Sequence, residues 1–279
     1  MLAYHEETKR RWALKVIKVG ERPDPTVKEF VRNEASVLKA VEHPNIVKLF
    51  DFRDEAIYTA SPTYKRKVAY IAMEAAENGD LIKLITSYGR IWEEAARYYF
   101  NQLIDTLEHI HFSGYCHLDI KPDNILFDSN YNLKLWDFGF SSDRKIHWTR
   151  KGTLNYAAPE IFAQEKYWGP VTDIFSAGII LFIMVTGHPP FCKPDVSDMR
   201  YKHICNNNIE RFWELVCKKK DGTMSSYSDD FKDLVNAMLS PYPHARPSLA
   251  EVRTHPWMQG ATLSSKSIKI YFDKLSMKH

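Results

Sequence analysis

Short apolar runs near the beginning of the chain have the length of β-strands. Residues 11–19 (RWALKVIKV), 45–52 and 68–74 each predict a strand. The stretch 53–67, between the last two runs, is mostly polar and predicts a long loop that looks like an insertion. The sequence therefore indicates that the first quarter of the chain is rich in strands.

Apolar residues recur at helical spacing elsewhere. Asp24 followed by Pro25 is typical of a helix start, and the apolar pattern continues to Val41 with Glu34 on the same face. Residues 92–112 predict a long helix with a broad apolar stripe, and residues 172–187 are apolar on every side, which predicts a buried helix. A carboxylate such as that of Glu34 needs a partner if its helix face is buried; otherwise it is a solvated surface charge.

Composition narrows the class of protein only slightly. The 279 residues are 44% hydrophobic and 26% charged, as in ordinary globular proteins. The net charge of +3 is too small to indicate nucleic-acid binding. The longest apolar run, 179–185, is too short to span a bilayer, and the first residues carry no signal-peptide pattern. We therefore expect a cytoplasmic protein that binds neither nucleic acid nor membrane, with its four cysteines reduced (Cys116, Cys192, Cys205 and Cys217).

The stretch 114–139 gathers the side chains that phosphoryl transfer needs. Asp119 could accept or orient the proton of an attacking hydroxyl, and Lys121 could neutralise a transferred phosphoryl group. Asn124 and Asp137 carry oxygen ligands of the kind that magnesium prefers. A loop, a hairpin and a second loop would bring these groups together, although acidic loops often merely cap helices.

The pattern H-x-D-x-K-P-x-N followed by D-F-G resembles the catalytic and metal loops of eukaryotic protein kinases. The resemblance implies a bilobal α+β fold, with a small β-rich lobe (1–74, truncated), a larger helical catalytic lobe (75–258) and a short tail (259–279). It implies a serine/threonine kinase that uses ATP and Mg²⁺ on protein substrates, most similar to the calcium/calmodulin-dependent kinase group. A segment closing in A-P-E resembles an activation segment, in which Thr153 would bond near the catalytic loop.

The same resemblance assigns positions to the nucleotide. Lys15 would pair with Glu34 and hold the α and β phosphates of ATP. Asp80 would contact ribose or a basic substrate residue, unless it is a helix cap. The adenine would be held by further positions: a sandwich between Ala13 and Leu126, the gatekeeper Met73, and the backbone of Glu74 and Ala76.

Other matching positions are structural or regulatory in kinases. The resemblance implies a buried ion pair between Glu160 and Arg246, and an activating phosphate on Thr149. Asp173 would hold the catalytic loop from beneath, or would only cap its helix. Leu118 stands where many kinases have the arginine that receives the activating phosphate, so we hypothesise that Thr149 phosphorylation is not needed for activity.

One family feature lies outside the sequence. The glycine-rich phosphate loop of kinases would precede Met1, because of either an incomplete start or a real deletion; this suggests reduced activity of this chain or, alternatively, a pseudokinase that serves as a binding or scaffold module. A phosphotransferase for small molecules is a further alternative. The complete set of polar catalytic residues favours an enzyme, and the long segment that closes in A-P-E favours a protein substrate.

Overall fold

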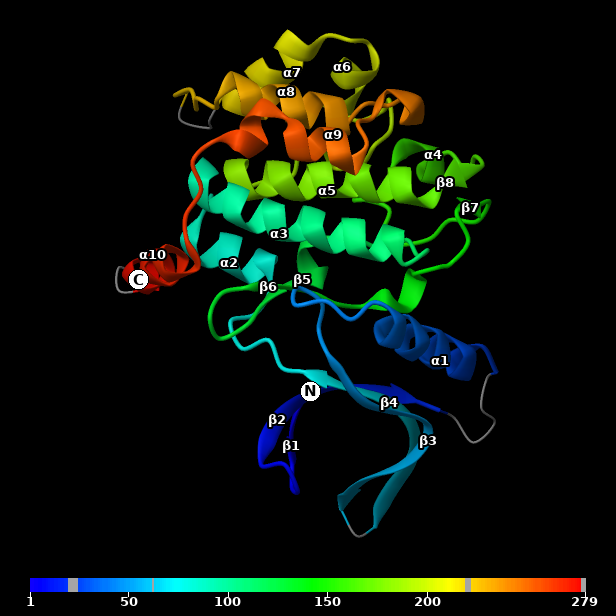
Figure 1. Cartoon of the computed structure of the whole chain (residues 1–279). Helices are drawn as coiled ribbons and strands as arrows, with labels where there is room; N and C mark the ends of the chain where they lie inside the picture. The colour runs from blue at the N-terminus through cyan, green and yellow to red at the C-terminus, as the bar shows by residue number, and fades with distance from the viewer. Residues whose placement is uncertain (20–24, 62, 219–221, 277–279) are drawn as a thin grey trace.

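The structure is a computed structural model that describes residues 1–19, 25–61, 63–218 and 222–276. It consists of a small β-sheet with one helix against it and a larger stack of helices (Figure 1). The predicted bilobal α+β architecture is confirmed. The division into residues 1–74, 75–258 and 259–279 stays a prediction.

The small lobe is a four-stranded antiparallel sheet in the order β1-β2-β4-β3. Its strands are β1 (Leu2–His5), β2 (Arg10–Lys18), β3 (Leu49–Ser61) and β4 (Tyr64–Glu74). The prediction of a loop over 53–67 is wrong, because β3 and β4 continue through this stretch as one long hairpin. Its outer half has no buried face, so its side chains lack the apolar alternation that marks a strand.

Helix α1 (Pro25–Ala40) follows the predicted apolar pattern and packs against the sheet. Its buried face includes Val31, Glu34 and Leu38, so the carboxylate of Glu34 lies inside the protein. The predicted cap Asp24 lies outside the described residues.

The large lobe contains the remaining helices and two short strand pairs. The helices are α2 (Leu81–Tyr88), α3 (Glu93–Phe112), α4 (Pro159–Phe162), α5 (Gly169–Thr186), α6 (Tyr201–Cys205), α7 (Ile209–Cys217), α8 (Asp229–Met238), α9 (Leu249–Thr254) and α10 (Ser265–Ser276). The strand pairs are β5 (Ile125–Phe127) with β6 (Leu133–Leu135), and β7 (Ile146–His147) with β8 (Tyr167–Trp168).

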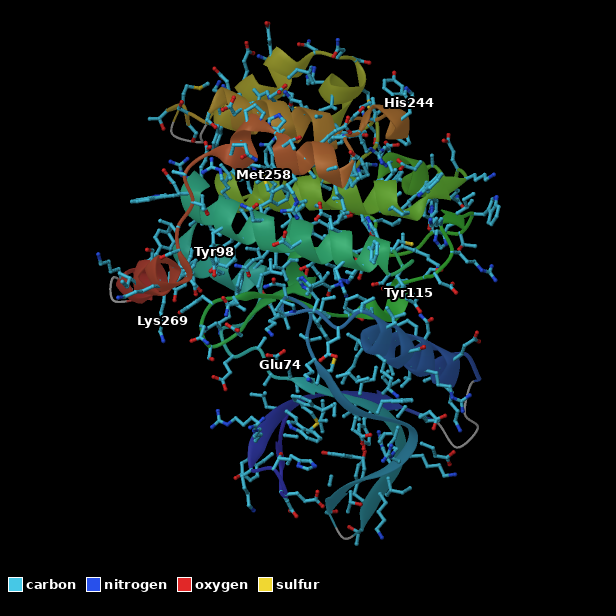
Figure 2. All side chains as sticks on the ribbon, in the orientation of Figure 1. Glu74, Tyr98, Tyr115, His244, Met258 and Lys269 are labelled. Carbon is cyan, nitrogen blue, oxygen red and sulfur yellow. The ribbon has the colours of Figure 1, made fainter. Side chains whose placement is uncertain are left out.

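Helices α3 and α5 pack side by side and form the centre of the large lobe (Figure 1). The helix α5 is long and apolar enough to cross a membrane by composition, but 89% of it is buried inside the protein. We therefore interpret α5 as a core helix, which agrees with the sequence prediction of a buried helix. The chain passes from the sheet to the helices after Glu74, which Figure 2 labels at the junction of the two lobes.

Candidate active site

Three segments far apart in the sequence meet at one ammonium group. Lys15 Nζ on β2 lies 2.9 and 2.8 Å from the two carboxylate oxygens of Glu34 on α1. The same nitrogen lies 2.6 Å from Oδ1 of Asp137, which directly follows the strand β6 and Trp136. The Glu34 side chain is fully buried, so the predicted pairing of Lys15 with Glu34 is present in the structure.

The charges around Lys15 favour its protonated form. Burial alone would lower the pKa of Lys15, but the carboxylates of Glu34 and Asp137 outweigh burial and raise this pKa above its ordinary value. The rings of Phe30 and Trp136 also lie 5.5 and 5.6 Å from Nζ. Lys15 is therefore a fixed positive charge at neutral pH.

A cavity of about 340 Å³ adjoins this lysine between the two lobes. Six predicted nucleotide positions line it: Ala13, Lys15, Met73, Glu74, Ala76 and Leu126. Ala13 comes from the sheet of the small lobe and Leu126 from β5 of the large lobe, as a sandwich around a flat ring requires. The cavity is within the range of volumes that small-molecule sites occupy.

Asp80 is not among the residues that line this cavity. Its side chain caps α2 by accepting a hydrogen bond of 2.7 Å from the backbone N–H of Lys83. This contact matches the capping alternative. A contact of Asp80 with ribose or with a substrate stays a prediction.

A second polar cluster surrounds the carboxylate of Asp119. Its Oδ2 lies 2.8 Å from Lys121 Nζ and 3.2 Å from the side-chain amide of Asn124. Its Oδ1 accepts a hydrogen bond of 2.7 Å from the backbone N–H of Thr153, whose hydroxyl lies 2.9 Å from Lys121 Nζ. The structure thus brings together four of the predicted catalytic residues.

These contacts keep Asp119 ionised. Burial alone would raise the pKa of Asp119, but the hydrogen bonds from Lys121 and Thr153 lower this pKa below its ordinary value. The carboxylate can therefore accept a hydrogen bond from a neighbouring hydroxyl at neutral pH.

Backbone contacts join the two loops that carry these residues. The backbone N–H of Trp136 donates to the carbonyl of Asn124 at 3.2 Å. His117 is fully buried between the loops, where its Nδ1 accepts from the N–H of Asp119 and its Nε2 donates to the carbonyl of Trp136. Asp137 itself adopts a left-handed backbone with φ 61°, a conformation that Asp tolerates better than most residues.

The core helix α5 holds the catalytic loop through Asp173. This buried carboxylate accepts hydrogen bonds from the backbone N–H groups of His117 (2.9 Å) and Leu118 (2.8 Å), and lies 2.9 Å from Nε2 of His111. It fixes Leu118 in a left-handed backbone with φ 65°, which is unusual for a bulky residue. Asp173 therefore supports the loop and is not merely a helix cap.

The activation segment approaches the catalytic loop closely at Gly152. A Cβ atom added to Gly152 would lie 2.2 Å from the carbonyl oxygen of Leu118, and φ of Gly152 is +77°. Only glycine allows this approach. The side chain of Leu118 adds a small apolar cluster with Cys116, Ala157, Ile161 and Tyr167, which anchors the segment.

A bidentate ion pair fastens the end of this segment to the large lobe. Arg246 donates from Nη1 and Nη2 to the two carboxylate oxygens of Glu160, both at 2.7 Å. The Arg246 side chain is fully buried and that of Glu160 is 5% exposed. The ion pair that the resemblance implies is present.

Comparison with known proteins identifies the family. The protein kinase domain model matches residues 1–258. The chain belongs to the protein kinase family. Lys15 with Glu34, the stretch 117–124 and the D-F-G segment are the positions of this chain that match the family's motifs.

Curated relatives of this kinase include several serine/threonine kinases. The chain is 34% identical to CBL-interacting protein kinase 11 of Oryza sativa subsp. japonica over 87% of the chain and 44% of the relative. It is 33% identical to the carbon catabolite-derepressing protein kinase of Secale cereale, over 93% of the chain and 48% of the relative. It is 32% identical to serine/threonine-protein kinase SIK2 of Gallus gallus, over 92% of the chain and 30% of the relative. The chain thus spans less than half the length of these relatives.

Sequence reasoning did not single out three features of this kinase's site. Trp136 lines the cavity and contacts Lys15, and its indole N–H donates to the carbonyl of Asp123. Val47 and the N-terminal residues Met1 and Leu2 also line the cavity. The position of Trp136 directly before D-F-G was the available signal for its role.

Proposed function

We propose that this chain is a serine/threonine protein kinase that transfers the γ-phosphate of ATP to protein hydroxyl groups. The observation that carries the proposal is that one polar cluster adjoins the interlobe cavity at Lys15, and that a second cluster lies on the loop bonded to Trp136, which lines the same cavity. One cluster is Lys15 with Glu34 and Asp137, and the other is Asp119 with its three partners. The names of the curated relatives support the same activity.

The residues beside the cavity fit ATP with magnesium. Asn124 uses its amide nitrogen on Asp119, which leaves its amide oxygen for a metal ion. The described residues contain no cluster of three His, Cys, Asp or Glu side chains, which suits Mg²⁺, since this ion is usually held by one or two side chains with phosphates and water. In this proposal Asn124 and Asp137 hold Mg²⁺, which would neutralise the phosphate charge.

The chain's own side chains would position the reactants. Lys15, held by Glu34, would bind the α and β phosphates, while Ala13 and Leu126 enclose the adenine beside Met73 and the backbone of Glu74 and Ala76. Asp119 would orient the attacking hydroxyl, and Lys121 would stabilise the charge on the transferred phosphoryl group. Thr153 keeps both side chains in place.

The proposed substrates are proteins that present Ser or Thr, and the proposed location is the cytoplasm. Lys121 two residues after Asp119 supports Ser/Thr over Tyr acceptors, by resemblance to the family. The pseudokinase alternative rests only on the glycine-rich loop that would precede Met1, whereas each of the polar catalytic residues is present and paired within the site, which favours an enzyme.

The direct test is the transfer of labelled γ-phosphate to mixed peptides. We expect incorporation into Ser- and Thr-containing peptides, none into peptides whose acceptor is Tyr, and loss of the signal when a chelator removes Mg²⁺. Incorporation that survives the chelator, or no incorporation into any peptide, would contradict the proposal.

A second prediction concerns Thr149, which is exposed and whose backbone carbonyl accepts a hydrogen bond from the hydroxyl of Tyr167, a member of the Leu118 cluster. Because the Leu118 cluster anchors the segment by apolar packing, Thr149→Ala is expected to keep a rate within about tenfold of the parent. Thr153→Ala serves as the comparison on the same segment and is expected to lose far more activity. A hundredfold loss in Thr149→Ala would refute this hypothesis.

A further inference from the structure

The outer half of the hairpin β3–β4 projects from the small lobe at the end remote from the helices (Figure 1). It comprises Ala56–Ser61 of β3 and Tyr64–Lys67 of β4, and none of these side chains is buried. Ile57, Tyr58 and Tyr64 are 59%, 39% and 41% exposed. A two-stranded hairpin with no covered face is only marginally stable in water, so this segment lacks the packing that would explain its length.

The inner half of the same hairpin is held by α1. Lys28 lies 3.0 Å from Glu55, Arg32 pairs with Asp54, and Lys39 lies over the ring of Phe52 at 4.7 Å. Among the described residues, α1 makes no ion pair or cation–π contact with the part of β3 that follows Glu55. The outer half is therefore an extension beyond the lobe's own core.

The outer half also forms an open sheet edge. Strand β3 is the last strand in the order β1-β2-β4-β3, so one side of its backbone has no neighbouring strand among the described residues. Ala56–Ser61 (AIYTAS) contains no charged residue, and Ile, Tyr and Thr favour extended structure. Proteins normally protect such edges with charges or proline, because exposed edges pair with other chains.

Positive charge lies on the strand beside this edge. Lys65, Arg66 and Lys67 are exposed, and no acidic residue occurs between positions 56 and 67. Side chains alternate along a strand, so Lys65 and Lys67 lie on one face and Arg66 on the other. The contact of Lys67 with Glu55 is 3.6 Å between side chains that are more than half exposed, and contributes little.

We propose that the outer edge of β3, Ala56–Ser61, binds an extended acidic segment of a partner protein by β-strand addition. The backbone of the added strand would pair with β3, and its carboxylates would meet the cations of β4 on both faces of the hairpin. An added strand lies about 10 Å from β4, a distance that a long basic side chain and a Glu side chain span together. The interaction does not depend on catalysis.

The test measures binding of short fluorescent peptides without ATP. A probe that alternates Glu with Val and Thr is expected to bind the parent chain. The triple variant Lys65→Glu/Arg66→Glu/Lys67→Glu is expected to bind it at least about tenfold more weakly, because like charges then face each other. The matched control Lys202→Glu/Lys266→Glu/Lys269→Glu changes the net charge equally at exposed sites elsewhere and is expected to bind like the parent.

Two further probes distinguish strand addition from charge alone. An acidic probe with proline at alternate positions lacks N–H donors for the ladder and is expected to bind at least about tenfold more weakly. Equal binding of both probes, no binding of the first probe to the parent, or equal losses in the two triple variants would overturn the proposal. The proposal would also be overturned if the chain bound RNA, anionic vesicles or a second copy of itself more tightly than the acidic probe, and if that binding were lost in the variant of residues 65–67.

Discussion

Asp137→Ala is expected to lower phosphoryl transfer by at least about a hundredfold to a thousandfold, the range for losing one preorganised electrostatic contact in an active site. Among the described residues, Asp137 is the large-lobe carboxylate that contacts Lys15, and in the proposed mechanism it also holds Mg²⁺. The Asp137 side chain is 23% exposed, and in the variant Lys15 still has its ion pair with Glu34, so we expect the fold to be retained. The measurement is the steady-state rate of peptide phosphorylation at saturating ATP, together with the urea midpoint of unfolding.

Asp123→Ala provides the matched control for Asp137→Ala. Asp123 lies in the same region but its side chain is exposed, and only its backbone carbonyl contacts Trp136. This variant is expected to keep a rate close to that of the parent. Equal rates in Asp137→Ala and Asp123→Ala would remove the basis of the proposed metal role.

Arg246→Ala is expected to reduce the free energy of unfolding by about 3–5 kcal/mol, because it leaves the buried carboxylate of Glu160 without its partner. This loss is a large part of the roughly 5–15 kcal/mol that stabilises a typical domain. The measurement is urea unfolding of parent and variant under the same conditions. The activation segment ends at this pair, so its loosening is expected to lower activity as well.

Arg253→Ala is the comparison for the ion pair. Arg253 contacts Asp105 and Glu108 at 2.5 Å, but these side chains are 37–45% exposed, and such pairs contribute only about 0–1 kcal/mol.

Replacing both partners of the buried pair, Glu160→Met with Arg246→Met, is expected to recover much of the stability lost in Arg246→Ala. If Arg246→Ala costs no more than Arg253→Ala, burial of the pair is not what stabilises this end of the segment.

The sequence allowed the catalytic cluster to be predicted because its residues are polar, close together and chemically specific. Asp119, Lys121, Asn124 and Asp137 fall within nineteen positions of a dense motif; the first three contact one another, and Asp137 contacts Lys15. Glu34 on an apolar helix face indicated that a buried carboxylate there would need a partner, and the resemblance to kinases supplied Lys15 as that partner.

Other features could not be read from local patterns. The outer half of the β3–β4 hairpin has two exposed faces, so no alternation of apolar and polar residues marks it. Strand β1 is only four residues long, and the sequence pattern predicted neither this strand nor its pairing with β2. The need for glycine at position 152 depends on the carbonyl of Leu118, which only the folded chain brings close.

The meeting of Lys15, Glu34 and Asp137 at one ammonium has an evolutionary consequence. These positions lie 19 and 122 residues apart from the lysine, and each belongs to a different structural unit. Loss of Lys15 would leave both carboxylates without their cation, and loss of either carboxylate would leave Lys15 with one partner, so a single substitution is expected to persist only with a compensating change. Among descendants of this sequence that retain the activity, the three positions are therefore expected to stay fixed or to change as a set.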